Sequence, residues 1–388
     1  MRIMHISTRL ILGGSQENTV LSCMGQADEG HEVDLVYGPI HGPEGTMLPT
    51  VHEHGGINAI ETPNLVREVS PTRDLACLRE LKTLIREHRP DVVHTHSSKA
   101  GILGRAAAWS VGVPAVVHTI HGLPFHPYQS GIRNLAYVLA ERYAARRCHH
   151  IVTVADAMRD QAMARGIGRP EQYTTVRSGM VVDPFLDDTE SKTATRTRLG
   201  LPTDACLVGT ISRLAELKGH DDLLDALGED MRADPNLHLL WVGDGYWAER
   251  LLGRVRDEGL EAQVHAVGLV EPDTIPDWVR AMDILAHPSY REGLPRAVVQ
   301  GMLGARPVVT YDLDGGPEVC VSGQTGQLVT PGDVTGLRAA VRTLRESPEE
   351  AVAMGVRGRE RCREDFDWRV MVRRLLTLYE ELLGVSHG

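Results

Sequence analysis

The segment from Arg291 to Glu318 is the part of the chain best equipped to hold a polar ligand. It reads REGLPRAVVQGMLGARPVVTYDLDGGPE. One carboxylate, Glu292, precedes a Gly-Leu-Pro turn, and a second glycine-rich turn ends in Glu318. In an open parallel sheet such turns lie at the carboxyl edge, where ligands bind. The order therefore predicts hydrogen-bond acceptors and backbone amides gathered at one edge of a sheet.

Two cations, Arg213 and Lys218, follow an apolar run that ends at Thr210, in the sequence ISRLAELKGH. Arginine offers planar bidentate contacts, lysine offers a mobile point charge, and a nearby helix N-terminus adds backbone amides. This combination suits a diphosphate. A pair of solvated surface charges is the alternative, but the position at a sheet edge favours the diphosphate site.

Glycine-rich turns follow other predicted strands. In STRLILGGSQEN, Gly13 and Gly14 would let a ligand approach the backbone, and Ser15 is placed to cap the next helix. The GxGxxG spacing of a dinucleotide-binding fingerprint is absent, and a plain tight turn is the alternative. Further along, VGDG, and then Gly268 and Leu269 in VGLVEP, could present backbone groups to a nucleobase.

Histidines form two close pairs, His94 with His96 and His118 with His121, each at the end of a predicted strand. A metal site would need further ligands, and no neighbouring carboxylate or cysteine completes one. Polar residues at a sheet edge are the alternative. We therefore expect no metal here, and we expect His121, which precedes Gly122, to donate a hydrogen bond into a cleft between domains.

Short apolar runs alternate with helical patterns along most of the chain, which is typical of βαβ units and parallel sheets. The predicted strands are 3–6, 33–37, 92–94, 115–118 and 151–154, followed by 206–210, 237–242, 264–267, 284–286 and 307–311. The fold class is therefore α/β, with two doubly wound Rossmann-like domains at 1–180 and 196–366. A polar linker at 181–195 joins them, and a helix with one apolar face follows at 367–388.

Composition limits the classes of protein. With 388 residues and 42% hydrophobic content, the chain exceeds what one core normally holds, in agreement with two domains. Its six cysteines include no CxxC pair, which predicts neither a zinc site nor a disulfide framework and fits a reducing cytoplasm. A net charge of -11 argues against general nucleic-acid binding. No apolar run approaches the roughly 20 residues of a spanning helix, so we expect a soluble protein.

Together these motifs resemble a known family. The series formed by the GG loop, HTIHG, SRLAELKGH, VGDG, VGL, REGLPRAVVQ and DLDGGPE is similar to family 4 of the retaining, nucleotide-sugar-dependent glycosyltransferases. The resemblance spans almost the whole chain. It implies the GT-B fold, in which two Rossmann-like domains face a central cleft and the C-terminal helix crosses back to the N-terminal domain. The N-terminal domain would bind the acceptor, and the C-terminal domain would bind the nucleotide-sugar donor.

The resemblance also implies roles for individual positions. Arg213 and Lys218 match a basic pair that neutralises the donor diphosphate, and Glu292 matches the first Glu of an E-x7-E motif that binds donor-sugar hydroxyls. The residues implied in catalysis are His121, Arg213, Lys218 and Glu292. Those implied in donor binding are Gly14, Arg213, Lys218, Gly268, Leu269, Glu292, Gly293, Leu294, Gln300 and Glu318. Those implied on the acceptor side are Gly13, His94, Phe125 and Tyr128.

Gln300 departs from the family's pattern, because it replaces the second Glu of the motif, which contacts the nucleotide ribose. A neutral amide both accepts and donates hydrogen bonds, but it lacks the charge of a carboxylate. The ribose contact is therefore expected to be weaker or rearranged, and Glu318 is expected to share the nucleotide contacts. A helix residue that contacts no ligand is the alternative interpretation of Gln300.

The implied reaction transfers a hexosyl or N-acetylhexosaminyl group from a nucleotide-diphosphate sugar, expected to be UDP-linked, to a hydroxyl acceptor with retention of configuration. The donor phosphate itself would take the acceptor's proton, so the reaction requires no covalent nucleophile, no metal and no other cofactor. Two alternatives remain open. One is a nucleotide-sugar epimerase or hydrolase of the same fold, and the other is a non-catalytic nucleotide-sugar-binding protein.

The acceptor is expected to be a small molecule or a lipid-linked compound. The segment RNLAYVLAERYAARRCHH places Arg133, Arg142, Arg146 and Arg147 among apolar residues, which is compatible with contact between the N-terminal domain and an anionic membrane face. A solvated basic helix face is the alternative. We therefore expect a cytoplasmic protein, with peripheral membrane association left open.

Overall fold

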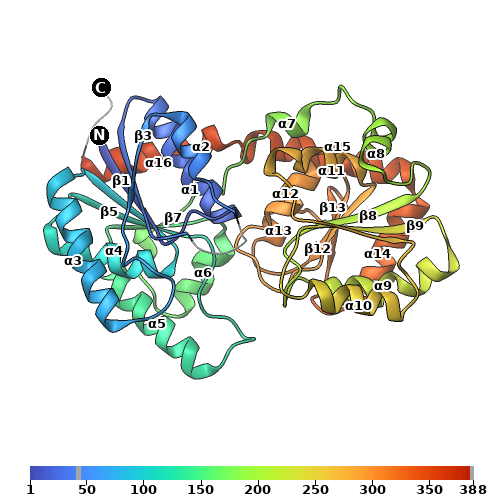
Figure 1. Cartoon of the computed structure of the whole chain (residues 1–388), viewed down its shortest axis with the longest axis horizontal. Helices are drawn as coiled ribbons and strands as arrows, with labels where there is room; N and C mark the ends of the chain where they lie inside the picture. The colour runs from blue at the N-terminus through green and yellow to red at the C-terminus, as the bar shows by residue number, and fades with distance from the viewer. Residues whose placement is uncertain (41–44, 385–388) are drawn as a thin grey trace. The chain divides into compact units, whose positions relative to one another are not determined.

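The computed structural model describes residues 1–40 and 45–384, and it divides into two compact units. The first unit consists of Met1–Met180 with the segment from Asp367 onwards, and the second consists of Val181–Phe366. Each unit is built on one parallel sheet with helices against its faces (Figure 1). The two Rossmann-like α/β domains expected from the sequence are therefore present.

The first unit contains a seven-stranded sheet in the order β3-β2-β1-β4-β5-β6-β7, in which all neighbours are parallel. Its strands are β1 (Arg2–Ser7), β2 (Glu32–Tyr37), β3 (Ile57–Glu61), β4 (Val92–His96), β5 (Ala115–Ile120), β6 (His150–Thr153) and β7 (Tyr173–Thr175). The sequence does not predict β3 and β7. Both are edge strands that stay partly exposed, so neither has the continuous apolar run of a central parallel strand.

Helices cover both faces of this sheet. They are α1 (Gly14–Asp28), α2 (Leu48–His54), α3 (Pro71–His88), α4 (Ser98–Val111), α5 (Gly131–Ala145), α6 (Asp156–Ala164) and α16 (Trp368–Leu383), with a 3-10 turn at Pro170–Gln172. Successive strand residues point to opposite faces. Ile3 and Val92 therefore pack in one core, and Met4 and Val93 pack in another beneath α3 and α4.

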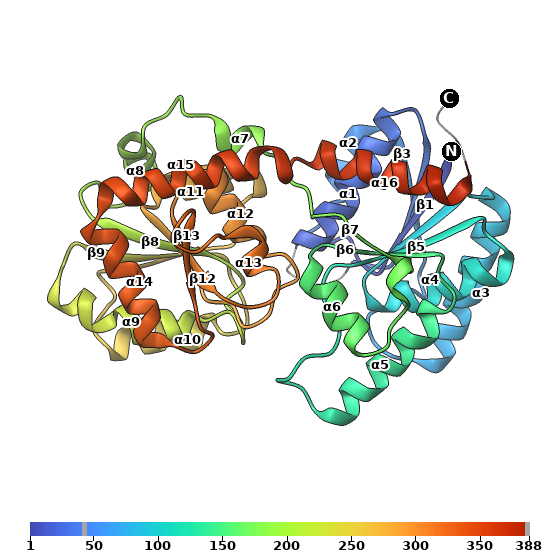
Figure 2. The same ribbon diagram turned by 180° about the vertical axis from the view of Figure 1, so that it is seen from behind.

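The C-terminal helix α16 packs beside α1 on the face that contains Ile3 (Figure 1, Figure 2). It starts where the Asp367 carboxylate accepts a hydrogen bond from the Arg369 amide at 2.7 Å. Its buried stripe consists of Met371, Val372, Leu375, Leu376, Leu378 and Tyr379. Residues 181–366 separate α16 from the rest of the first unit in sequence, yet it completes that unit's core.

The second unit contains a six-stranded parallel sheet in the order β10-β9-β8-β11-β12-β13. Its strands are β8 (Cys206–Ile211), β9 (Leu237–Val242), β10 (Val264–Gly268), β11 (Ile284–His287), β12 (Val308–Tyr311) and β13 (Gly326–Val329). Only β13 was not predicted. It is also a partly exposed edge strand, and it begins with glycine.

The helices of the second unit are α7 (Asp183–Leu186), α8 (Lys192–Leu199), α9 (His220–Ala233), α10 (Ala248–Asp257), α11 (Ile275–Ala281), α12 (Arg296–Leu303), α13 (Gly316–Val319), α14 (Val334–Glu346) and α15 (Pro348–Asp365), with a 3-10 turn at Pro272–Thr274. Residues 181–195, expected to be a linker, hold α7 and the start of α8 within this unit. The buried Arg196 guanidinium anchors α8, because it lies 2.7 Å from Asp283. Of the described helices, none has the length and apolarity needed to cross a membrane.

Candidate active site

The predicted donor residues of the second unit lie in loops at the carboxyl ends of its strands. Arg213 and Lys218 follow β8, Gly268 ends β10, Glu292 follows β11, and Glu318 lies in α13 after β12. The strands β8 and β11 are direct neighbours in the sheet. Their two loops therefore meet at one edge, which is where ligands bind in open α/β sheets.

Close backbone contact joins these two loops. The Leu217 carbonyl accepts hydrogen bonds from the Tyr290 amide at 2.9 Å and from the Ser289 hydroxyl at 3.2 Å. Gly219 has a φ of 72°, and a Cβ atom there would lie 2.0 Å from the Pro288 carbonyl oxygen. Only glycine fits this position, so it is Gly219 that lets the loop carrying Lys218 approach the loop carrying Glu292.

Glu292 is the centre of a small charged group. Its Oε1 atom accepts hydrogen bonds from Lys218 Nζ at 2.6 Å and from His287 Nε2 at 2.9 Å, and both Lys218 and Glu292 remain partly exposed. Burial acts to raise the pKa of the Glu292 carboxyl, but the Lys218 ammonium and the His287 hydrogen bond outweigh it and hold the pKa well below its ordinary value. The carboxylate is therefore ionised and can accept hydrogen bonds from hydroxyl groups.

Two members of this group were not predicted as site residues. His287 is the buried last residue of β11, and Asp314 accepts a hydrogen bond from the Glu292 amide at 2.8 Å. Asp314 has a φ of 51°, and the next residue, Gly315, donates to the Gly293 carbonyl at 3.2 Å. Its position at the end of a predicted strand was the one sequence feature that could have marked His287 as a site residue. The contact of Asp314 depends on the packing of β12 beside β11.

Gly243, in the loop after β9, packs closely against the loop after β8. Gly243 has a φ of 132°, and a Cβ atom there would lie 2.2 Å from the Ser212 carbonyl oxygen. The Gly243 amide also donates to the Gly268 carbonyl at 2.9 Å. These contacts hold the β8, β9 and β10 loops together and leave Leu269 58% exposed, where it can meet a ligand.

The remaining predicted donor residues of the second unit follow Glu292 in the sequence. Leu294 is buried, and Gln300 lies partly exposed on α12. Glu318 is partly exposed in α13, and its backbone carbonyl accepts a hydrogen bond from Arg361 at 3.1 Å. The structure therefore brings Lys218 and Glu292 into direct contact and leaves the nucleotide roles of Gln300 and Glu318 as predictions.

In the first unit, the glycine pair begins a helix. Gly13 is the N-cap of α1 and Gly14 is its first residue, and the Gly13 carbonyl accepts the Glu17 amide at 2.9 Å. The prediction that Ser15 caps the helix is wrong, because the helix starts before Ser15, whose hydroxyl donates to Gln16 Oε1 at 2.8 Å. The first amides of α1 still form the kind of helix terminus that attracts an anion.

The acceptor-side predictions of the first unit need one correction. His94 is fully buried, and its Nε2 and Nδ1 atoms lie 2.7 Å from the Thr119 hydroxyl and 2.5 Å from the Tyr379 hydroxyl. The prediction that His94 faces an acceptor is therefore wrong, because its side chain points into the core beneath α16. Phe125 is also largely buried, whereas Tyr128 is 52% exposed.

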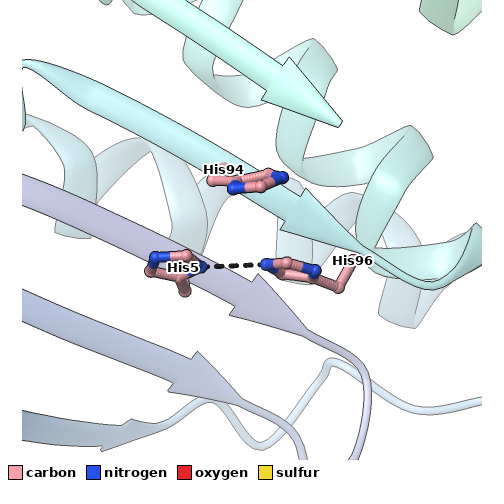
Figure 3. Close-up of side chains that lie close together, drawn as sticks. All are labelled: His5, His94 and His96. Carbon is pink, nitrogen blue, oxygen red and sulfur yellow. Dashed lines mark hydrogen bonds between the residues drawn. The ribbon is translucent and has the colours of Figure 1, made fainter. Parts of the chain in front are cut away.

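His94 instead belongs to a buried cluster with His5 and His96 (Figure 3). Each ring offers a nitrogen within 4.8 Å of the others, so these are the described residues that could hold a metal ion. His5 was not singled out in the sequence. His118 points to the opposite face of the sheet, where its Nδ1 lies 2.9 Å from the Thr95 hydroxyl. The histidine pairs seen in the sequence are therefore divided between two faces.

Comparisons with known proteins agree with this architecture. The family model for a glycosyl transferase 4-like domain matches residues 13–179, and the model for glycosyl transferases group 1 matches residues 205–347. A UDP-Gal:alpha-D-GlcNAc-diphosphoundecaprenol alpha-1,3-galactosyltransferase of Escherichia coli is 25% identical over 349 residues, which cover 88% of this chain and 87% of the relative. A 2-deoxystreptamine glucosyltransferase of Streptomyces kanamyceticus is 29% identical over 322 residues, covering 80% of this chain and 82% of that protein.

A solved structure shares the fold. Anabaena HepE in complex with UDP-glucose superposes with a TM-score of 0.84 at 22% identity, covering 98% of this chain and 100% of that one. One family model falls in each compact unit, and together they account for most of the sequence. The chain therefore belongs to the family 4 type of glycosyltransferases, enzymes of the GT-B fold that use nucleotide-sugar donors.

Proposed function

We propose that this chain transfers a hexosyl or N-acetylhexosaminyl group from a UDP-linked sugar to a hydroxyl acceptor, with retention of configuration and without a metal ion. The contact between Lys218 and the ionised Glu292, at 2.6 Å, carries the proposal. A nucleotide-sugar donor can bind both residues. Its diphosphate pairs with the Lys218 ammonium, and its sugar hydroxyls donate hydrogen bonds to the Glu292 carboxylate. The name of the E. coli relative specifies UDP-galactose, and HepE was solved with UDP-glucose, which supports a UDP-linked donor.

In the proposed reaction the acceptor hydroxyl attacks the anomeric carbon as the bond to the diphosphate breaks. An oxygen of the leaving diphosphate takes the acceptor's proton, and the products are a glycoside and a nucleoside diphosphate. Arg213 and Lys218 stabilise the charge that develops on the diphosphate, and Glu292 orients the sugar.

The remaining roles extend this proposal. His121 contacts the sugar, and Gly14 at the start of α1 meets the diphosphate. The nucleotide and sugar contacts of the second unit are assigned to Gly268, Leu269, Gly293, Leu294, Gln300 and Glu318. Gly13 and Tyr128 remain assigned to the acceptor, and the largely buried Phe125 is assigned to it with them.

Binding and turnover test the proposal separately. UDP-sugars are expected to raise the melting temperature, because a ligand at 100 times its Kd stabilises the native state by about 2.7 kcal/mol. GDP- and ADP-linked sugars serve as controls. Release of UDP only when donor and acceptor are both present would establish transfer. Release without an acceptor would indicate a hydrolase, an altered sugar without release an epimerase, and binding without turnover a sensor.

We further propose that the acceptor is lipid-linked and that α5 brings the first unit to an anionic membrane surface. Ile132, Leu135, Leu139 and Tyr143 recur every three or four residues along α5, and all are exposed, with Ile132 85% exposed. Basic residues flank this stripe at Arg133, Arg142, Arg146 and Arg147. Such a helix binds by burying its apolar stripe while its cations meet anionic headgroups. The name of the E. coli relative specifies a diphosphoundecaprenol acceptor, which agrees with this proposal.

The variant Leu135→Gln/Leu139→Gln is expected to lose binding to anionic vesicles. Each leucine would contribute on the order of 1.5 kcal/mol when buried in lipid, so their joint loss should weaken binding more than a hundredfold. Co-sedimentation with vesicles of defined anionic content measures this. Leu75→Gln on α3 is the matched control, because Leu75 is 49% exposed on another helix of the same unit. Equal sedimentation of all three proteins would exclude α5 as the docking surface and favour a soluble acceptor.

A further inference from the structure

Three buried histidines of the first unit have no role in the reaction described above. His5 lies on β1, His94 and His96 lie on β4, and none of these residues is more than 1% exposed. Figure 3 shows the three rings gathered across the two neighbouring strands, with His5 bonded to His96. Buried polar groups of this kind need partners, so their hydrogen bonds have to be traced.

The rings form part of a hydrogen-bonded chain that leads to His121. It begins at Gln26 on α1, whose Oε1 atom lies 2.7 Å from His5 Nε2. His5 Nδ1 then lies 2.9 Å from His96 Nε2. His96 Nδ1 in turn lies 3.0 Å from His121 Nε2. The chain therefore connects a buried amide to the histidine that we assign to the donor sugar.

Burial keeps the inner rings neutral. It lowers the pKa of His5 to about 4, and it is the largest cause that lowers the pKa of His96 well below the ordinary value. A neutral imidazole carries one donor nitrogen and one acceptor nitrogen. In a chain of such rings, the proton position on the first ring decides the proton position on every ring that follows.

Gln26 decides the direction in which hydrogen bonds are donated along this series of rings. Its carbonyl oxygen only accepts, so His5 carries its proton on Nε2 and accepts from His96 at Nδ1. His96 then accepts at its own Nδ1, and His121 donates from Nε2. Tyr379 on α16 lies within reach of the other end of the amide, because its hydroxyl is 3.5 Å from Gln26 Nε2. That hydroxyl can accept from the amide while it donates to His94.

We propose that Gln26 is a positioning residue that determines, through His5 and His96, which ring nitrogen of His121 carries the proton. When Nε2 donates to His96, Nδ1 of His121 is an acceptor toward any hydroxyl that it meets, which reverses the donor role expected for His121 from the sequence. The inference rests on the proposed function only for its effect on turnover, since the tautomer of His121 can be observed without substrate.

A metal ion would require a different arrangement of the same rings. Two Zn–N bonds of about 2.0 Å at a tetrahedral angle hold the ligand nitrogens about 3.3 Å apart. The nitrogens of His5 and His96 are 2.9 Å apart, which is the separation of an N–H···N hydrogen bond. Both nitrogens of His94 already contact hydroxyls, those of Thr119 and Tyr379. The geometry therefore favours the hydrogen-bonded chain over a metal centre.

The variant Gln26→Met tests the proposal, because it removes the acceptor while keeping the length of the side chain. A buried N–H on His5 Nε2 would then lack an acceptor, and an unsatisfied donor is less tolerated than an unsatisfied acceptor. We expect the proton of His5 to move to Nδ1 and the whole chain to reverse. Ring ¹⁵N spectra should show His121 protonated on Nε2 in the wild type and on Nδ1 in Gln26→Met.

Gln26→Glu is the matched control, because it keeps an acceptor beside His5 and should leave His121 protonated on Nε2. The His121 signals are identified by their loss in His121→Asn. An unchanged tautomer of His121 in Gln26→Met would overturn the proposal. Should that variant fail to fold, His5→Phe interrupts the chain one ring later. It leaves His96 Nε2 without an acceptor, so by the same reasoning His121 should then be protonated on Nδ1. If His121 were protonated only on Nε2 in His5→Phe, that result would also contradict the proposal.

Two further measurements complete the test. Zinc retained in stoichiometric amount, with His5 and His96 signals that change on chelation, would replace the proposal with a metal centre. Turnover of Gln26→Met is expected to fall about tenfold in kcat, the effect of one lost hydrogen bond. A reversed tautomer with unchanged kcat would support the chain and count against the sugar contact of His121, so the two proposals can fail separately.

Discussion

Replacement of Lys218 by alanine is expected to lower kcat/KM for sugar transfer by about 10²- to 10³-fold, the usual cost of removing one charge that stabilises a transition state. Charge develops on the diphosphate as the glycosidic bond breaks, and Lys218 would meet it at the edge of the second sheet. The same substitution leaves the Glu292 carboxylate without its closest cation, at 2.6 Å in the wild type. Both effects reduce turnover.

Glu292→Gln separates charge from shape at this position. The amide keeps an acceptor for sugar hydroxyls but cannot form the ion pair, so we expect a loss similar to that of Lys218→Ala. The double variant should lose less than the sum of the two single effects, because the residues interact directly. Lys192→Ala is the matched control, since Lys192 pairs with Asp283 at 2.5 Å in the same unit, away from the donor loops. Steady-state rates of UDP release at wild-type level in both single variants would remove this site from consideration.

Acidification is expected to unfold the first unit before the second. His5, His94, His96 and His118 are buried, and burial is the largest cause that lowers each pKa below that of an exposed histidine. Between the folded pKa and about 6.5, the unfolded chain binds more protons than the folded one, so falling pH favours unfolding. The stability that these neutral histidines contribute to the folded unit is fully present above about pH 6.5. Below about pH 6.5, each histidine lowers the free energy of unfolding by up to about 1.4 kcal/mol per pH unit, and the four together lower it by about 5 kcal/mol per pH unit.

That loss is comparable with the whole stability of a domain. In the second unit, burial lowers the pKa of His220 to about 4 and also lowers that of His265, so fewer groups act there. Hydrogen-exchange mass spectrometry at pH 7.5 and 5.5, corrected for the intrinsic exchange rates, should show loss of protection in β1 and β4 while β8 and β9 stay protected. A variant that removes one titrating ring, His118→Gln, should flatten the pH dependence. Equal protection of both units at both pH values would contradict the prediction.

The sequence predicts the two domains and the loops of the candidate site because both depend on local patterns. Apolar runs identify the central strands, and glycine-rich turns after them identify the loops that carry Lys218 and Glu292. The direct contact between these residues could not be predicted in the same way. It requires β8 and β11 to be neighbours, and two strands lie between them in sequence.

The histidine cluster shows the same limit. His5 and His94 are far apart in sequence, and they meet because β1 pairs with β4 at the point where the strand order of the sheet reverses. The resemblance implied that His94 lies on the acceptor side, but the alternation of faces decides otherwise. Ile3, His5, Val92 and His94 share one face, and α16 closes over that face from the other end of the chain.

If Lys218 and Glu292 hold the donor as proposed, the ion pair between them affects the relative affinity for substrate and product. Each residue is the other's resident partner, so any ligand must displace an internal competitor. A nucleotide sugar replaces both partners at once, since its phosphate takes the lysine and its hydroxyls take the carboxylate. A nucleoside diphosphate alone would pair with Lys218 but has no sugar hydroxyls to take the place of Lys218 beside Glu292. With these proposed roles, the resident pair would favour the intact donor over the nucleoside diphosphate, and its re-formation would help the product to leave.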